Sequence, residues 1–162
     1  MTSPSLTSLY TEIIFEHDKR PLRAGLREPF DAEVHHVNPT CGDEITLRLH
    51  LTGPADAQRV EDIGHDAQGC AMSRASASIM ADLLTGLTVE EADAVADAFE
   101  HAMASRGKDP GDEELLGDGV ALLGASKFPG RVKCVLLPWK AYRAALVEAR
   151  TLAASGTEEA GR

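Results

Sequence analysis

Residues 38–51 read NPTCGDEITLRLHL, and their second half carries the clearest structural pattern in the chain. Over residues 44–51, polar residues alternate strictly with isoleucine and leucine. A period of two is typical of a β-strand that has one buried and one solvated face. Gly53-Pro54 follows directly and predicts a turn at the end of this strand.

Two further segments flank this strand and are also expected to be extended. Residues 32–37 precede it, and residues 60–66 follow it after the turn. Short strands that follow one another in the chain with only turns between them favour antiparallel pairing. The sequence therefore predicts a meander of three short strands.

Helical patterns mark the segments before and after this sheet. An amphipathic helix is predicted before the proline-containing stretch 21–29. Its apolar stripe consists of Leu6, Leu9, Tyr10, Ile13 and Ile14. A second helix is predicted over residues 73–84, ending at Gly86. A third begins at Thr88, because Glu91 three residues later completes a capping box.

The later part of the chain has weaker signals. The acidic stretch 112–119 predicts a solvated connection, and residues 120–125 predict a short helix. We place Pro138 in the first turn of a last helix that carries Trp139 and Tyr142 in the core. The residues from 155 to 162 offer nothing apolar to bury, so we expect a disordered tail there.

Length and composition limit the classes of protein to consider. The chain has 162 residues, close to the usual size of one domain. Its formal net charge of −10 argues against binding to nucleic-acid phosphates, which requires a basic face. No stretch approaches the roughly 18 consecutive apolar residues of a membrane span, and the first residues lack a secretory pattern. We therefore expect one domain over residues 1–154, with neither a nucleic-acid nor a membrane partner.

The three cysteines, Cys41, Cys70 and Cys134, are the first candidates for chemistry. An odd number fits a secreted disulfide framework poorly and favours reduced thiols in the cytoplasm, where cysteines bind metal or react. Gly42 allows the side chains of Cys41 and Asp43 to turn toward one point. Three sulfurs and one carboxylate oxygen would suit tetrahedral zinc. The alternative is that each cysteine packs in the core as a small hydrophobic residue.

Four motifs occur together in an order typical of one protein family. The first consists of LY at residues 9–10, II at 13–14 and EHDKRP at 16–21. The others are NPTCGD at 38–43, GCAMSRASAS at 69–78 and KFPGRVKC at 127–134. A chain with these motifs resembles the SufU branch of the IscU/NifU N-terminal family. The resemblance extends from about residue 9 to residue 146, which is nearly the whole domain.

The resemblance implies an α+β fold in which a small antiparallel sheet of about three strands packs against several helices. It also implies a role in iron–sulfur cluster biogenesis, with a pyridoxal-phosphate (PLP) cysteine desulfurase of the SufS type and downstream assembly proteins as partners. We therefore expect a zinc-dependent sulfurtransferase that accepts persulfide sulfur from the desulfurase. The alternative within the family is a scaffold on which a labile [2Fe–2S] cluster is assembled from iron and passed to apoproteins.

Two features favour the SufU branch over the scaffold branch. Lys133 stands where scaffold members carry a histidine before the third cysteine, and a protonated lysine cannot be a metal ligand. Residues from about 106 to 127 fill the place of the SufU insertion, and Arg131 falls where that branch has an arginine. Asp18 and Arg20 depart from the family, which commonly has tyrosine and asparagine there.

The resemblance also implies a role for each site residue. The implied zinc ligands are Cys41, Asp43, Cys70 and Cys134. Cys41 is the implied persulfide acceptor, and docking of the partner would exchange a ligand and free its thiolate. Arg131 and Lys133 are candidates to offset the double negative charge that such a ligand set leaves on Zn²⁺. A third hypothesis is a structural zinc domain that only binds a partner.

Overall fold

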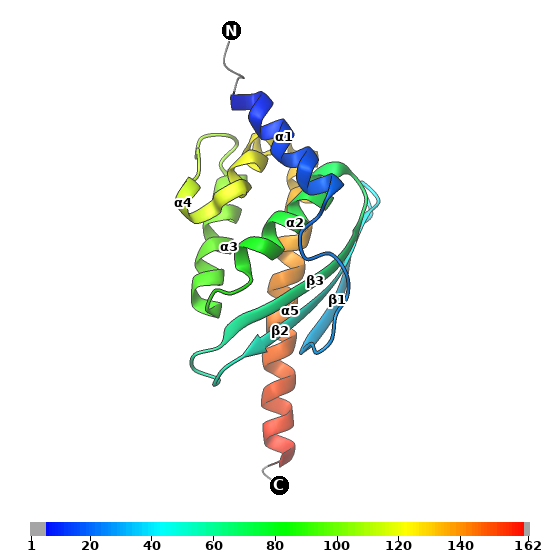
Figure 1. Ribbon diagram of the computed structural model, residues 1–162, viewed down its shortest axis with the longest axis vertical. Coiled ribbons are helices and arrows are strands. Elements are labelled where there is room, and N and C mark those ends of the chain that lie inside the picture. Colours follow the sequence, from blue (N-terminus) through cyan, green and yellow to red (C-terminus); the bar gives the residue numbers. More distant parts are fainter. Residues whose placement is uncertain (1–5, 161–162) are drawn as a thin grey trace.

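The computed structural model describes residues 6–160, with side chains over residues 8–153 (Figure 1). Its elements in chain order are α1 (Leu6–Lys19), β1 (Ala32–Asn38), β2 (Asp43–Thr52), β3 (Arg59–Gln68), α2 (Ala71–Leu84), α3 (Val89–Ala104), α4 (Glu113–Leu116), the 3-10 helix η1 (Gly117–Lys127) and α5 (Pro129–Ala160). The strands form one antiparallel sheet in the order β1-β2-β3. The predicted α+β fold and meander are therefore confirmed.

Strand β2 shows the predicted period of two. Ile45, Leu47 and Leu49 are buried, whereas the residues between them are partly exposed. Helices α2 and α5 pack against the apolar face of the sheet (Figure 1). In the hairpin between β1 and β2, Asn38 pairs with Asp43. The NPTCGD turn therefore lies at one end of the sheet.

Helix α5 begins earlier than the sequence predicted. Its first residue is Pro129, where the missing N–H of proline has no cost, and Pro138 lies inside the helix. The placement of Pro138 in the first turn was therefore wrong. An interior proline removes one intrahelical hydrogen bond. Near this point Ser76 of α2 donates to the Val135 carbonyl at 2.6 Å and accepts from Trp139 Nε1 at 3.1 Å.

Helix α5 is also the longest element, with 32 residues. Within residues 6–160, no helix combines the length and apolar composition that crossing a membrane requires. The helix reaches Ala160, while residues 161–162 lie outside the described part. The domain boundary at 154 and a disordered tail over 155–162 stay predictions.

The acidic stretch 112–119 is not the solvated connection that its composition indicated. It contains α4 and the start of η1, and Leu116 is 1% exposed. The carboxylates of Asp112 and Glu113 remain exposed while the leucine enters the core. The short helix predicted over residues 120–125 is part of η1.

The apolar stripe of α1 is only partly covered. Tyr10, Ile13 and Ile14 are half-buried, but Leu9 remains 46% exposed. The side chain of Leu6, which the sequence also assigned to this stripe, lies outside the described residues. Helix α1 therefore presents apolar surface to solvent.

The predicted capping box at the start of α3 is present and can be tested. Thr88 Oγ1 accepts from the Glu91 N–H at 3.1 Å, and the Thr88 N–H donates to Glu91 Oε1 at 2.9 Å. We expect Thr88→Ala to lower the free energy of unfolding by about 1 kcal/mol, measured by urea denaturation. Thr151→Ala, an exposed change within α5, is the control and should have a smaller effect. Equal losses in both variants would contradict the cap.

Candidate metal centre

The turn between β1 and β2 brings Cys41 and Asp43 to the same end of the sheet. The N–H groups of Cys41 and Gly42 donate to the Asn38 carbonyl at 3.3 and 2.9 Å. Gly42 has a φ of +73°, a conformation that glycine adopts without steric cost. The chain can therefore reverse tightly, with Cys41 exposed at its tip and Asp43 buried as the first residue of β2.

Cys134 reaches the same point from helix α5. The ligand atoms of Cys41, Asp43 and Cys134 all lie within 4.8 Å of one another. Cys134 is 3% exposed and Asp43 is 0% exposed. The structure thus brings together three of the four predicted ligands.

Cys70, the fourth predicted ligand, lies beside this cluster but is not one of the three groups within that distance. Its backbone N–H donates to Asp43 Oδ1 at 2.9 Å. Its side chain lines the same surface hollow as Cys41 and Cys134. The structure therefore places the Cys70 thiol at the edge of the cluster.

The two oxygens of the Asp43 carboxylate have different surroundings. Oδ1 accepts from the Cys70 N–H and, at 3.2 Å, from the Ser73 hydroxyl, both at the start of α2. Oδ2 is buried and accepts no hydrogen bond of normal geometry from the described residues, although the Cys134 thiol lies close to the carboxylate. A buried oxygen without a donor is costly, and coordination of a metal ion would satisfy it. A carboxylate oxygen with neighbouring thiols is a donor set that fits zinc.

Asp43 is ionised at neutral pH in this environment. Burial opposes its ionisation, but contacts with the Cys134 thiol, the Cys70 amide and the Ser73 hydroxyl have the opposite effect. Together these contacts hold the pKa of Asp43 below its ordinary value. The carboxylate is therefore ready to act as a ligand.

The thiol of Cys134, unlike the carboxyl group of Asp43, is held in its protonated form. Burial, assisted by its neighbours Asp43 and Cys41, raises the pKa of the Cys134 thiol far above its ordinary value. The metal-free protein therefore keeps this thiol protonated at neutral pH. Since metals bind the thiolate, binding at this site must release the Cys134 proton.

The two cations predicted near the site occupy different places. Arg131 and Lys133 are both exposed on the first turns of α5. Arg131 lines the hollow that holds the three cysteines, whereas Lys133 does not line it. Among the described residues, no histidine joins the cluster. His65, the histidine nearest to Cys70 in the sequence, is buried and forms a hydrogen bond through Nε2 to the Leu22 carbonyl at 2.9 Å.

Sequence reasoning missed two residues that shape the site, Gly69 and Ser73. A Cβ atom at Gly69 would lie 2.1 Å from Asp43 Oδ1. Ser73 is buried and supplies the side-chain hydrogen bond to the same oxygen. Both residues lie in the GCAMS motif, but the motif alone does not predict that they contact Asp43.

Gly69→Ala should displace the Asp43 carboxylate and abolish stable metal binding, because the new methyl group overlaps Oδ1. The measurement is zinc content by elemental analysis after dialysis. Gly86→Ala is a matched control, since Gly86 also has a positive φ of +93° but has open space around it. Full zinc content in Gly69→Ala would show that Asp43 is not a ligand.

Ser73→Ala should weaken zinc binding by roughly 10- to 100-fold, the usual effect of removing a group that orients a ligand. Competition with a chromophoric chelator measures this affinity. Ser126→Ala removes another buried hydroxyl, one that donates to the Leu123 carbonyl, and should leave zinc affinity unchanged. The expectation is wrong if the two variants bind zinc equally well.

The fold and the site together define a class of small α+β domains that gather cysteines and an aspartate at the end of a three-stranded antiparallel sheet. The family described as NifU-like N terminal domain matches residues 9–135 of this chain. The chain belongs to this family of iron–sulfur cluster assembly proteins.

Similar proteins divide between two activities. The chain is 40% identical over 137 residues to the zinc-dependent sulfurtransferase SufU of Bacillus subtilis, covering 85% of this chain and 88% of that protein. It is 38% identical over 146 residues to the iron–sulfur cluster assembly scaffold protein IscU of Streptococcus pyogenes serotype M1, covering 90% and 87%.

A solved structure supports the same family. The crystal structure from Fervidobacterium islandicum, described as an iron–sulfur cluster assembly scaffold protein for the SUF system, is 32% identical with a TM-score of 0.72. The match covers 88% of this chain and 99% of that one. The predicted IscU/SufU-like fold and family are confirmed.

Proposed function

We propose that this protein is a zinc-dependent sulfurtransferase that accepts persulfide sulfur from a PLP cysteine desulfurase of the SufS type. The observation that carries the proposal is the unequal exposure of the cluster: Cys41 is exposed, whereas Asp43 and Cys134 are buried. A donor protein can therefore reach the Cys41 sulfur without opening the fold. The name of the Bacillus subtilis relative supports the same activity.

The residues that would hold zinc are Cys41, Asp43 and Cys134, with Cys70 beside them as the fourth ligand. Bound zinc would lower the pKa of the cysteine thiols and so keep them as thiolates at neutral pH. Arg131, which lines the same hollow, offsets part of the negative charge that collects there. Lys133 does not line this hollow, so we assign the charge-offsetting role to Arg131 and not to Lys133.

Cys41 is the residue that we assign to the transfer step. Docking of the donor would exchange a ligand and free the Cys41 thiolate, whose sulfur then attacks the terminal sulfur of the donor persulfide, so that a new sulfur–sulfur bond forms on Cys41. The sulfur–sulfur bond of the donor breaks, and its electron pair stays on the donor cysteine as a thiolate. Among the described residues the Cys41 thiol makes a long contact of 3.9 Å with the Gly130 carbonyl and has the Cys134 thiol as a neighbour, and its other side is exposed.

We place this activity in the cytoplasm, where a free thiol stays reduced. All three cysteines are free in the structure. Reduced cysteines are the ordinary state in that compartment. The persulfide on Cys41 would then pass to downstream iron–sulfur assembly proteins.

A scaffold function is the second candidate. The name of the Streptococcus pyogenes relative favours it, at nearly the same identity as the sulfurtransferase. The same thiols and carboxylate would then hold a transient [2Fe–2S] cluster. Such a protein should become coloured and oxygen-sensitive after reconstitution with iron and sulfide.

Metal analysis and desulfurase turnover together test the proposal. We expect about one zinc per chain, and faster sulfide release by the cognate desulfurase when the wild-type protein is added. Cys41→Ala should return the desulfurase to its rate alone, because the acceptor sulfur is gone. Cys134→Ser should also lose stimulation, but through loss of zinc, so measuring metal content separates the two effects.

Other outcomes would select the other hypotheses. Iron with acid-labile sulfide in the purified protein, and desulfurase turnover that it does not change, would indicate the scaffold. Zinc with turnover that is stimulated equally by wild type and Cys41→Ala would show that Cys41 is not the acceptor.

A further inference from the structure

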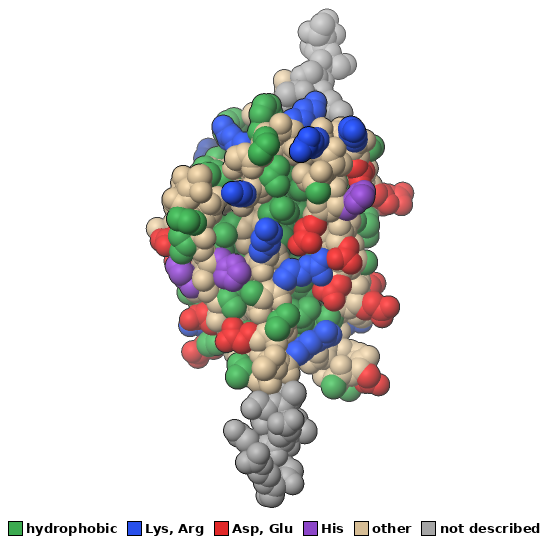
Figure 2. Space-filling model, turned by 180° about the vertical axis from the view of Figure 1, so that it is seen from behind, with side chains coloured by type: hydrophobic (Ala, Val, Ile, Leu, Met, Phe, Trp, Pro, Cys, Tyr) green, Lys and Arg blue, Asp and Glu red, His purple; other side chains and the backbone are tan. Residues whose placement is uncertain are grey.

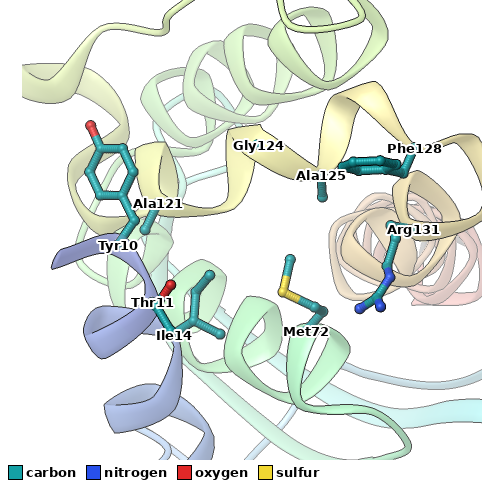
Figure 3. A pocket seen from close by; sticks show the side chains of 9 residues that line it. All are labelled: Tyr10, Thr11, Ile14, Met72, Ala121, Gly124, Ala125, Phe128 and Arg131. Carbon is teal, nitrogen blue, oxygen red and sulfur yellow. The ribbon is translucent and has the colours of Figure 1, made fainter. Parts of the chain in front are cut away.

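A second hollow, which we call the α1 pocket, lies beside the metal centre. It has a volume of about 370 Å³ and lies between α1, α2, η1 and the start of α5. Figure 3 shows its walls: Tyr10 and Ile14 on α1, Met72 on α2, Ala125 and Phe128 at the end of η1, and Arg131 on α5. The lining is mostly apolar, and its polar groups are the hydroxyls of Tyr10 and Thr11 and the guanidinium of Arg131.

The α1 pocket adjoins the hollow that contains the cysteines. Phe128 and Arg131 line both of them. Phe128 is 60% exposed, although it is a large apolar side chain. With Ile14 and Met72 of the pocket it forms a contiguous apolar surface, and such surfaces with a polar rim mark sites of protein contact. A protein that docks over Cys41 would therefore meet the α1 pocket at the rim formed by Phe128 and Arg131.

The charge around this end of the molecule points to an acidic partner. Lys127, Arg131 and Lys133 are all exposed, and within the described residues none of them has a salt bridge. By contrast, Arg27 and Arg74 are paired with Asp62 and Asp18. Figure 2 shows Lys and Arg side chains beside hydrophobic ones at the upper end of the molecule, where α5 begins in Figure 1. In a chain with net charge −10, a basic end favours a complementary acidic surface.

We propose that the α1 pocket receives an apolar side chain from the protein that donates sulfur to Cys41, and that a carboxylate of this donor pairs with Arg131. The inference rests on the proposed function, because sulfur transfer requires the donor to reach Cys41. A few side chains that fill pockets, often aromatic residues and arginine, carry most of the binding energy of a protein interface. The donor segment is therefore an apolar side chain with an acidic residue close to it.

Gly124 allows the pocket to be filled without disturbing the fold. It lies in the wall of the pocket and is exposed. A Cβ atom there has open space around it, and the backbone does not have the positive φ that favours glycine. Gly124→Leu should therefore occupy the pocket with its own side chain. Ala94→Leu, an exposed position on α3 outside the pocket, adds a similar side chain as a control.

The test is the dissociation constant between each zinc-loaded variant and the cognate PLP cysteine desulfurase, measured by calorimetry. We expect Gly124→Leu to weaken binding by about tenfold or more, with unchanged zinc content and thermal stability. Ala94→Leu should bind like the wild type. Equal affinity of Gly124→Leu and wild type would overturn the proposal.

Arg131→Glu tests the charged part of the proposal. We expect it to weaken binding by about tenfold or more and to reduce the dependence of affinity on salt concentration. Lys140→Glu, which reverses an exposed cation farther along α5, should have a much smaller effect. If both reversals weaken binding equally, only the net charge matters, and the assignment of Arg131 to a specific pair is wrong.

Failure of the pocket proposal and failure of the proposed function would give different results. Wild-type protein that stimulates the desulfurase, with a Gly124→Leu variant that stimulates it at the same concentrations, would overturn the pocket alone. Wild-type protein that neither binds nor stimulates the desulfurase would overturn both. Self-association that Gly124→Leu abolishes, with desulfurase binding intact, would assign the pocket to a second copy of this chain and overturn the proposal.

Discussion

The hydrogen bond from the Cys70 N–H to Asp43 Oδ1 is the contact on which the geometry of the candidate metal centre depends. It joins the first residue of β2 to the start of α2, and so it fixes two cysteine-bearing segments that are far apart in the chain. A carboxylate is favourable at this position because the start of a helix carries partial positive charge. With Oδ1 held there, the unpaired Oδ2 remains available to a metal ion. The absence of a side chain at Gly69 is what gives the carboxylate room.

The site and the core share helix α2. Ser73 contacts Asp43 at the site, while Ser76, one turn later, contacts Val135 and Trp139 in α5. The indole of that tryptophan stacks on Phe99 of α3 with ring centroids 4.1 Å apart. The position of Cys134 in α5 is therefore fixed from both sides, by the site and by buried aromatic packing. This explains how a helix with an interior proline still presents a cysteine at a defined point.

The sequence predicted the elements that local patterns define, and it was less accurate where distant contacts determine the outcome. The alternation in β2 and the Thr88 capping box are properties of neighbouring residues, so both were recognised. The start of α5 was misplaced because Pro129 and Pro138 are each compatible with a first helical turn, and only packing against α2 distinguishes them. Burial of Leu116 in an acidic segment likewise depends on tertiary contacts. For the candidate site, the motifs predicted four ligands, three of which the fold brings together, but they did not predict which oxygen of Asp43 is held or that Cys70 lies at the edge.

The cluster combines two buried groups, Asp43 and Cys134, with one exposed thiol, Cys41. This difference in exposure is what makes the proposed sulfur transfer to Cys41 chemically reasonable. Asp43 and Cys134 are buried, so they can hold a metal while a partner is bound. The pKa of the Cys134 thiol is raised by burial, so it gives up its proton only when a metal replaces that proton. Cys41 lies exposed at the tip of a glycine-containing turn, with a long contact to the Gly130 carbonyl and the Cys134 thiol beside it, so it is the thiol of the cluster that a partner can reach. A site that only had to retain a metal would have no reason to leave one thiol at the surface, beside an open pocket.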